Sequence, residues 1–597
     1  MEHSLSLSYW DYLLMLLYTL VIIGIGIHFN RKKSSATEYL LAGRSMHWLP
    51  VSISMFMALF STYSLVMTPG EVYIYGISMW IPSLIQPFIS VLGFVLFYRF
   101  FFKMKSFTTF EYLEYRYDKV FRFAMAFVSA YSGILYIAMV ILATALIFEA
   151  AAGWPAWITI LVVGLVGTTY AVMGGLKAVI WSDVFQFIVM GVGFVAIIYA
   201  LCTGIDGGAV RGVTYAFEHG KGAVRFTEAD FYKLTPYVRL SFWLLLWSVI
   251  SGGLSSGTNQ TTMQLLFSTK SYKSALKSQW FSSMIIIPIS LILMFMGLSI
   301  FTYFSQHPDP TVNGQTALFS FIAHRLPTPL PGLVLAAVLA AAMSTVVSGV
   351  NSTATMYLKE LHQKYFNPNI DESQQFIISW RAVLIFGLFC TLMALIIKYS
   401  STVLSETFVE MSTIFTVVGI VGFPAYIFAV LSRKASSRFV WLLFGIMAGL
   451  QSGTTIWYAV SRRCTLVWKE GDALGWAGPI AIWPLLLMCV ISIIIWGLYR
   501  GAIAKWPKWK DQLLAIPTIP FGMTISILVW YIVSHALISD KPRDLSFQWV
   551  TLPPIVSYIV ICTYTHFFGP EQPKEKYEGL VFTERNDAYK KLEDDKA

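Results

Sequence analysis

Runs of about 20 apolar residues recur along this chain, and they constrain its fold more than any other feature. A helix of that length crosses roughly 30 Å of hydrocarbon, so each run can span a bilayer. Of the 597 residues, 56% are hydrophobic and 12% charged, a composition foreign to soluble multidomain proteins. The apolar sequence suffices for about fifteen crossings. We therefore expect an all-α polytopic protein embedded in a cell membrane, in contact with the lipid bilayer.

Other classes of protein are disfavoured. The five cysteines are far apart and form no CxxC pair, so neither a transition-metal site nor redox chemistry is indicated. The sequence contains no HExxH motif, no paired carboxylates within one span and no cofactor motif. An enzyme is therefore not indicated. The net charge of +10 does not indicate nucleic-acid binding, because most basic residues fall in loops on one side of the membrane. Glu2 and the lack of a basic start argue against a cleaved signal peptide.

The basic residues predict the orientation. The first span, residues 9–29, ends in Arg31, Lys32 and Lys33, which indicates a cytoplasmic end. Lys and Arg recur in alternate loops after it, whereas the short opposite turns at 70–77 and 150–155 have none. The loop at 204–238 runs against this trend. We expect the N-terminus outside and the C-terminus in the cytoplasm.

Two apolar segments carry so many small and polar residues that we expect them to be broken helices. The first, residues 51–69, contains six Ser or Thr before Pro69 and Gly70. The second, residues 240–267, contains the run GGLSSGTNQ at 252–260. Interrupted helices at corresponding positions of two halves are typical of inverted-repeat transporters, which hold the substrate where the helices unwind. The alternative, that Gly and Ser only allow close packing, explains one such helix better than two.

The chain divides accordingly. The expected parts are an N-terminus with the first span and a cytoplasmic lead-in (1–46), a first five-helix repeat with an external loop (47–238), a second five-helix repeat (239–436), accessory helices (437–569) and a charged cytoplasmic tail (570–597).

Residues 341–348, AAMSTVVS, place hydroxyl groups at mid-membrane depth. Polar groups are costly there and mark a ligand site. Hydroxyl and carbonyl oxygens suit a small hard cation such as Na⁺.

Three segments carry a resemblance to a known family. Residues 170–186, YAVMGGLKAVIWSDVFQ, closely resemble the fingerprint of the sodium:solute symporter family. Residues 38–46, EYLLAGRSM, and 110–116, FEYLEYR, are similar to its cytoplasmic lead-in and to its loop before the third core helix. The match runs in order from about residue 10 to 435. Residues 68–76, TPGEVYIYG, most resemble the branch that carries monocarboxylates, iodide and vitamins.

The resemblance implies a LeuT-type 5+5 inverted repeat with one extra N-terminal helix and about four C-terminal helices. It also implies alternating access driven by Na⁺ as the coupling ion. The implied sodium ligands are the backbone carbonyls of Met57, Phe60 and Ala341 and the hydroxyls of Ser344 and Thr345. The alternative for these hydroxyls is a bond back to the preceding helical turn.

Some relatives bind a second sodium with an acidic residue and further hydroxyls. Asp183 and Ser348 match that pattern, but Val347 stands where relatives have a hydroxyl. We therefore expect one Na⁺ per cycle, with two as the alternative. Asp183 has two alternative roles, as the partner of Lys177 or as a helix cap.

The solute is expected beside the broken helices, among neutral hydroxyl and amide groups. The candidate contacts are Ser61, Thr62, Ser83, Gln86, Tyr136, Asn259, Gln260 and Thr261. Tyr136 stands where sialic-acid carriers of the family have an Arg, and Thr261 where sugar carriers have an aromatic gate, so both solutes are disfavoured. Leu265 replaces the Arg that often follows Gln264 in the family, a change at the expected inner gate.

These observations predict a sodium-coupled secondary active symporter that imports a small polar or anionic organic solute, and no enzyme. A sodium-coupled sugar or polyol symporter and a transporter-like membrane sensor remain as alternatives. A channel would need a continuous polar pore, against which the broken helices argue. Saturable, electrogenic uptake separates these classes.

Overall fold

The computed structural model describes residues 7–30, 35–77, 81–222, 252–309, 317–399 and 425–450, together with shorter stretches at 312, 453, 494, 498, 510–515, 517–526, 562–573, 576 and 580–581. Within these ranges the chain is almost entirely helical, and an isolated bridge joins Met46 to Thr269. This confirms the expected all-α class.

The chain falls into two compact units. The first comprises Met1–Thr109, Ala130–Tyr232 and Phe242–Ser412, and the second Phe110–Ser129, Lys233–Ser241 and Thr413–Ala597. The described helices of the first unit are α1 (Tyr9–Asn30), α2 (Ala36–Leu41), η1 (Ala42–Arg44), α3 (Trp48–Leu59), α4 (Thr62–Tyr75), α5 (Ile81–Lys103), α8 (Ala156–Leu161), η3 (Val162–Val166), α9 (Gly167–Gly204), α10 (Gly208–Glu218), α13 (Gln260–Phe267), α14 (Tyr272–Gln306), α15 (Ala317–Arg325), α16 (Leu330–Met356), η5 (Tyr357–Phe366) and α17 (Glu372–Tyr399). The second unit contains α6 (Glu111–Arg116) and α21 (Lys510–Leu513), and α7 (Lys119–Ala152) belongs partly to each unit.

Seven helices in the described ranges are long and apolar enough to cross a membrane, and the bent pair α3–α4 makes an eighth crossing if it counts as one span. The N-terminal span predicted at 9–29 is α1. The last span of the second repeat and the four predicted C-terminal spans lie mostly outside the described residues, so the expected total of about fifteen crossings stays a prediction.

The longest apolar run, Ala156–Gly204, contains 49 residues. As one straight helix it would measure ~70 Å, more than twice the hydrocarbon thickness. Gly175 divides it, because its backbone (φ 57°, ψ −165°) lies where residues with a Cβ are rarely found. A Cβ at this position would also approach the Tyr39 carbonyl oxygen to 2.8 Å. The run therefore consists of two segments that meet at Gly175.

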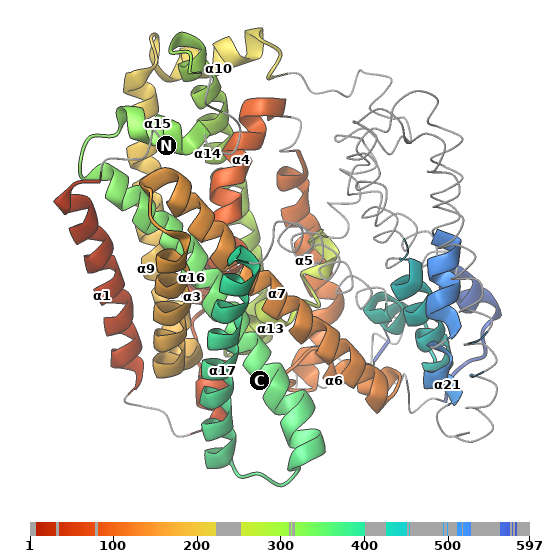
Figure 1. The fold of residues 1–597 in the computed structure, drawn as a ribbon. Helices are drawn as coiled ribbons and strands as arrows, with labels where there is room; N and C mark the ends of the chain where they lie inside the picture. Colours follow the sequence, from red (N-terminus) through yellow and green to blue (C-terminus); the bar gives the residue numbers. More distant parts are fainter. Residues whose placement is uncertain are drawn as a thin grey trace. The chain divides into compact units, whose positions relative to one another are not determined.

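Helix α16 is the centre of the first unit. It packs against α9, α1, α3 and α17 (Figure 1), and its run of Ala340, Ala341 and Ala342 is fully buried. Small side chains let neighbouring helices approach closely where no water is available to drive association. At the first turn of α16, Asp11 of α1 accepts a hydrogen bond from the Gly332 backbone N–H at 2.7 Å. A carboxylate there satisfies a free N–H and interacts favourably with the helix dipole.

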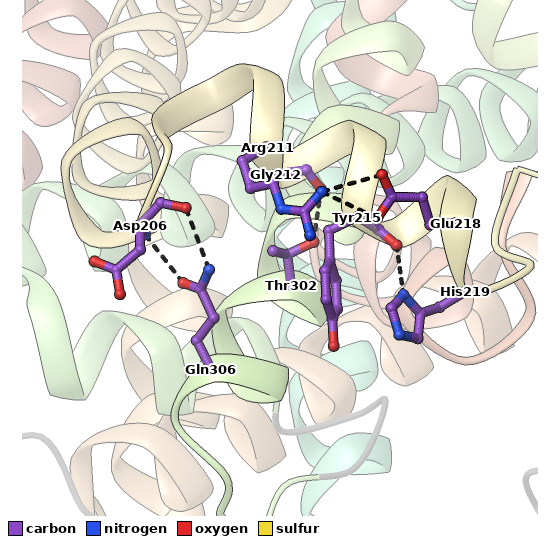
Figure 2. A network of polar contacts seen from close by, with 8 residues as sticks. All are labelled: Asp206, Arg211, Gly212, Tyr215, Glu218, His219, Thr302 and Gln306. Carbon is purple, nitrogen blue, oxygen red and sulfur yellow. Dashed lines mark hydrogen bonds and ion pairs between the residues drawn. The ribbon is translucent and has the colours of Figure 1, made fainter.

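Different contacts hold the two ends of the first unit together. The α10 end contains residues 74–77, 205–222 and 301–306. Figure 2 shows α10 lying on α14 there: the Thr302 hydroxyl donates to the Gly212 carbonyl at 2.7 Å, and the Gln306 amide bonds to both backbone groups of Asp206. Val72 of α4, Ala216 of α10 and Leu298 of α14 form an apolar cluster. Helix α10 thereby joins α4 to α14.

Lys221, just after α10, reinforces this contact. Its Nζ donates to the Ile74 carbonyl in the last turn of α4 at 2.6 Å and lies 4.7 Å from the centroid of the Phe301 ring. The Lys221 carbonyl accepts from the backbone N–H of Ile77 at 2.9 Å. A cation at a helix C-terminus is stabilised by the helix dipole.

The α2 end contains residues 36–46, 104–109 and 264–269, and polar side chains cross-link it. The Gln264 amide donates to the Leu40 carbonyl at 2.9 Å and to the Thr355 hydroxyl at 2.7 Å. Arg44 donates to the carbonyls of Lys105 and Ser106 at 2.9 Å. This end is therefore tied together by bonds among α2, α13, α16 and the loop after α5.

The second unit is organised around Arg116, which is 1% exposed. Its guanidinium donates to the carbonyls of Ala429 at 3.0 Å, Ser432 at 2.6 Å and Lys576 at 2.5 Å. Lys576 in turn donates from Nζ to the Tyr117 carbonyl at 2.8 Å. One planar cation thus satisfies carbonyls from two distant parts of the sequence.

Candidate functional site

The first predicted broken helix is broken, and the break follows Leu59. Phe60 and Ser61 have extended backbone angles between α3 and α4, and the two helices meet at 79°. The expected sodium ligands Met57 and Phe60 lie at this C-terminal end of α3. The last four carbonyls of a helix have no partner within it. Their oxygens are therefore available to a cation.

The break lies against α16. The Thr62 hydroxyl, at the first position of α4, donates to the Val338 carbonyl at 3.2 Å. Val338 lies one turn before Ala341, so the contact brings the carbonyls of the break close to the expected ligands on α16. Ala341, Ser344 and Thr345 are all buried, at 0, 0 and 3% exposure.

The two expected hydroxyl ligands behave differently. The Thr345 hydroxyl donates to the Ala341 carbonyl at 3.2 Å, which is the bond to the preceding turn considered as an alternative. The Ser344 hydroxyl has no hydrogen-bond partner, although it is buried. An unpartnered buried hydroxyl is unfavourable, so Ser344 has the stronger need for a ligand.

Asp183 of α9 lies beside Ser344. It is fully buried. Its Oδ2 accepts a hydrogen bond from the Ser54 hydroxyl of α3, its Oδ1 has no partner, and the Ser344 hydroxyl lies close to the carboxyl group. Lys177, considered as its partner, instead pairs with Glu38. A buried carboxylate needs either a proton or a nearby cation.

The remaining candidates for a second cation are placed as follows. The Ser348 hydroxyl is 3% exposed and has no partner. Val347 is fully buried and packs against Gly167, the first residue of α9. Asp183, Ser344 and Ser348 thus supply unpartnered oxygens from α9 and α16, which are packed together.

The second predicted broken helix is also interrupted. Residues 252–255 are helical, 256–258 form a turn, and Asn259 caps α13 by accepting from the Thr262 N–H at 3.1 Å. A Cβ on Gly257 would lie 2.3 Å from the Gly93 carbonyl oxygen of α5, and one on Gly252 would lie 2.4 Å from the Gln86 amide. The glycines therefore allow close packing in addition to the break. Residues 240–251 lie outside the described residues.

Several candidate solute contacts lie near the breaks. The Tyr136 hydroxyl of α7 reaches the Ser61 hydroxyl at the first break, while 44% of the Tyr136 side chain is exposed. Gln86 lies against the second broken helix, and Ser83 is one turn before it on α5. Thr261 is partly exposed and Asn259 exposed. Ser61, Gln86 and Tyr136 are the candidates best placed to contact a solute.

Two other candidates already have partners. The Thr62 hydroxyl donates to Val338 and accepts from the Thr144 hydroxyl at 3.2 Å. The Gln260 amide holds the loop at the α2 end: it accepts from the Thr109 N–H at 2.9 Å and donates to the Phe107 carbonyl at 3.1 Å. The sequence grouped Gln260 with Asn259 and Thr261 beside the solute, but successive helical residues face different directions.

Sequence reasoning did not single out Gln186 or Tyr18. Gln186 follows Asp183 by three residues on α9, so both lie on one helix face. The spacing within the segment SDVFQ was the available signal for Gln186. Tyr18 of α1 had no comparable signal.

Comparisons with known proteins identify the family of the chain. The model of the sodium:solute symporter family matches residues 39–449. Sodium-coupled monocarboxylate transporter 2 of Homo sapiens is 30% identical over 410 residues, which cover 65% of this chain and 63% of that protein. The sodium-dependent multivitamin transporter of Oryctolagus cuniculus is 29% identical over 434 residues, covering 70% and 65%. The match thus spans under two thirds of the length of these relatives, which are named as transporters.

A solved structure shows the same fold. The substrate-bound outward-open state of a Na⁺-coupled sialic acid symporter superimposes with a TM-score of 0.65 and 18% identity, covering 90% of this chain and 99% of that one. This confirms the LeuT-type fold expected from the sequence. With the family model matching well over half of its length, the chain belongs to the sodium:solute symporter family.

Proposed function

We propose that this chain is a sodium-coupled secondary active symporter that imports a small polar or anionic organic solute by alternating access. The observation that carries the proposal is the buried, unpartnered Ser344 hydroxyl of α16, which lies close to the Asp183 carboxyl group and on the helix that Thr62 at the break contacts. Na⁺ held by Met57, Phe60, Ala341, Ser344 and Thr345 joins α3 to α16. It thereby stabilises the conformation that retains the solute.

A second Na⁺ is proposed at Asp183 and Ser348. It is one of the two ways to neutralise the buried Asp183 carboxylate, the other being a proton, and Lys177 pairs with Glu38 instead. This departs from the one Na⁺ per cycle expected from the presence of Val347. Each ion that enters gains roughly 2.3 kcal/mol at a potential of about −100 mV.

The proposed solute site consists of Ser61, Ser83, Gln86, Tyr136 and Thr261. These groups are neutral hydrogen-bond donors and acceptors, so a bound carboxylate would be balanced by the co-transported Na⁺ and not by a fixed basic side chain. The relatives named for monocarboxylates and multivitamins make small monocarboxylates the first class to test.

The proposed orientation follows the basic residues of the loops: the N-terminus and the α10 end outside, the α2 end and the C-terminal tail in the cytoplasm. The bonds of Gln264 and Gln260 then hold the cytoplasmic side closed.

The proposal is tested with purified protein in proteoliposomes. Monocarboxylates and neutral polar solutes are screened for uptake and for solute-induced current with inward gradients of Na⁺ or K⁺. Saturable, electrogenic uptake that requires Na⁺ supports the proposal. Uptake that is equally fast in K⁺ and carries no current excludes it and favours a facilitator.

A further inference from the structure

Three buried polar side chains connect α14 to α5, two helices that carry none of the proposed sodium ligands. Gln279 and Ser283 lie one turn apart on α14, and Ser90 lies on α5. The Gln279 amide Nε2 donates to the Ser283 hydroxyl at 3.0 Å and lies 3.4 Å from the Ser90 hydroxyl. The two serine hydroxyls are 2.7 Å apart. All three residues are buried.

The direction of these bonds follows from the number of available protons. The Ser90 hydroxyl donates its one proton to the Pro87 carbonyl, one turn earlier, at 2.7 Å. Ser283 is therefore the donor in the contact between the two hydroxyls. The bonds thus form a series that runs from Gln279 through Ser283 and Ser90 to the backbone of α5.

The series ends where α5 is weakened. Pro87 lies inside α5, and a proline lacks the N–H that would bond to the carbonyl four residues earlier. Here that carbonyl belongs to Ser83, and Gln86 directly precedes the proline. Two residues of the proposed solute site therefore lie on the part of α5 that its own backbone bonds hold least firmly.

Ser90 also contacts the second broken helix. Its carbonyl accepts from the Ser256 hydroxyl at 3.3 Å, and Ser256 shares this proton with the Gly253 carbonyl at 2.6 Å. Ser256 begins the turn that interrupts this helix. A Cβ on Gly253 would lie 2.5 Å from the Ile89 side chain, so the broken helix packs closely on α5 here. Ser90 is therefore bound both to α14 and to the break beside which the solute is expected.

The Gln279 amide uses only one of its two ends. Its Oε1 is buried without a hydrogen-bond partner. A buried acceptor of this kind costs stability, and a leucine would fill a similar volume without that cost. Stability alone therefore does not explain a glutamine at this position.

We propose that Gln279 is a positioning residue for solute binding. Through Ser283 it holds Ser90 in place. Ser90 then fixes both the segment of α5 that carries Gln86 and the turn of the second broken helix. The inference rests on the proposed function, because it takes the solute to bind at these breaks. The proposed sodium ligands are on α3, α9 and α16, so the affinity for solute should depend on Gln279, whereas the affinity for Na⁺ without solute should not.

A purely structural role makes a different prediction. If the three side chains only pack α14 against α5, Gln279→Leu changes the unfolding temperature and leaves the half-saturating concentration of solute at the wild-type value. The proposal predicts the reverse. The half-saturating concentration rises, and the unfolding temperature stays the same or rises, because a buried acceptor without a partner is removed.

The first measurement needs no solute. Hydrogen exchange is followed by mass spectrometry in the purified full chain, in K⁺ and without Na⁺. We expect Gln279→Leu and Ser283→Ala to speed the exchange of amides in segments 83–91 and 252–258 about fivefold. Ser305→Ala is the matched serine control on α14, because its hydroxyl bonds back to its own helix. It should leave both segments unchanged.

The second measurement is uptake of radiolabelled propionate, a small monocarboxylate, into proteoliposomes with an inward Na⁺ gradient. The propionate concentration for half-maximal uptake should rise about fivefold in Gln279→Leu and in Ser90→Ala. Because both substitutions interrupt one series of bonds, the double variant should also show about a fivefold rise, and not the roughly 25-fold rise that independent effects would give. Binding of radioactive Na⁺ without solute should match the wild type in all three variants.

Four results would overturn the inference. In the first, both exchange and the half-saturating propionate concentration of Gln279→Leu match the wild type. In the second, only its unfolding temperature changes. In the third, the effects of Gln279→Leu and Ser90→Ala multiply. In the fourth, Na⁺ binding weakens together with the affinity for propionate. If the wild type takes up no propionate, the proposed solute class is wrong, which is a separate result, and the exchange measurement then decides on Gln279.

Discussion

The Thr62 hydroxyl at the start of α4 donates to the Val338 carbonyl of α16 at 3.2 Å, one turn before Ala341. This bond holds the break in the first core helix against the helix that supplies the other sodium ligands. The same hydroxyl accepts from Thr144 of α7 at 3.2 Å. Three helices therefore meet at one side chain.

Replacing Thr62 by Val tests this contact. Val has the same shape but neither donates nor accepts, so the break is held less firmly against α16. We expect the Na⁺ concentration for half-maximal uptake to rise about three- to tenfold, measured in proteoliposomes at saturating solute. Thr169→Val is a suitable control, because its exposed hydroxyl only bonds back to Leu165, one turn earlier. If both variants reach half-maximal uptake at the same Na⁺ concentration, the Thr62 contact does not contribute to sodium binding.

Single alanine substitutions of Ser344 and Thr345 should change the stability of the sodium-free protein in opposite directions. Ser344→Ala removes an unpartnered buried hydroxyl, so the sodium-free protein should become more stable, by about 1 kcal/mol. Thr345→Ala removes the bond to Ala341 and should lower sodium-free stability. Thermal unfolding in detergent with K⁺ as the only cation measures both. A clear loss of stability in Ser344→Ala would show that its hydroxyl is already satisfied.

Gln260 should control the α2 end. Gln260→Leu leaves the Thr109 N–H and the Phe107 carbonyl without partners, so the loop at 106–109 should open more often. We expect its amide hydrogens to exchange about tenfold faster, measured by mass spectrometry. Gln306→Leu is the matched control at the α10 end and should leave this loop unchanged. If exchange at 106–109 does not change in Gln260→Leu, the amide does not hold the loop.

Substitutions of Lys221 and Arg211 compare the effect of a contact at a helix end with that of an ion pair on the surface. Lys221→Met keeps the chain length but loses the bond to Ile74 and the contact with Phe301, so α10 should exchange its amides about threefold faster or more. Arg211→Met breaks the exposed pair with Glu218 and the contact with the Tyr215 ring, both within α10 itself, and exposed ion pairs contribute little to stability. An equal effect of the two substitutions would contradict the role given to Lys221.

Arg116 should be irreplaceable by Lys in the second unit. A single ammonium cannot reach the carbonyls of Ala429, Ser432 and Lys576 in the fork geometry of a guanidinium. We expect Arg116→Lys to destabilise the chain by about 2 kcal/mol and to expose the tail near Lys576 to proteolysis. Arg438, which is exposed, supplies the control Arg438→Lys. If the tail is equally resistant to proteolysis in both variants, Arg116 does not hold it in place.

The sequence predicted the architecture well, because polar runs in apolar segments are costly and therefore conspicuous. The Ser and Thr cluster at 52–68 predicted a break in the first core helix, but not its place. The break comes after Leu59, while Pro69 lies inside α4. A proline only weakens a helix locally, whereas contacts such as that of Thr62 with α16 decide where the chain turns.

Side-chain partners were harder to predict. Lys177 was considered as a partner for Asp183, six residues further along the chain. The structure pairs Lys177 with Glu38, which comes from a distant segment. Gln260 was predicted beside the solute with its neighbours on the broken helix, yet its amide bonds to the loop after α5. Tyr18 of α1 contacts Gln186 of α9, although the two helices are far apart in sequence. Such contacts depend on how helices pack, which a single sequence does not reveal.

The most direct test of the central claim is solute uptake by the double variant Ser344→Ala, Thr345→Ala. In proteoliposomes with an inward Na⁺ gradient, the wild type should take up solute much faster than with K⁺. The double variant should lose this difference while still being inserted and folded. If it keeps the full sodium dependence of the wild type, sodium does not couple to transport at these hydroxyls.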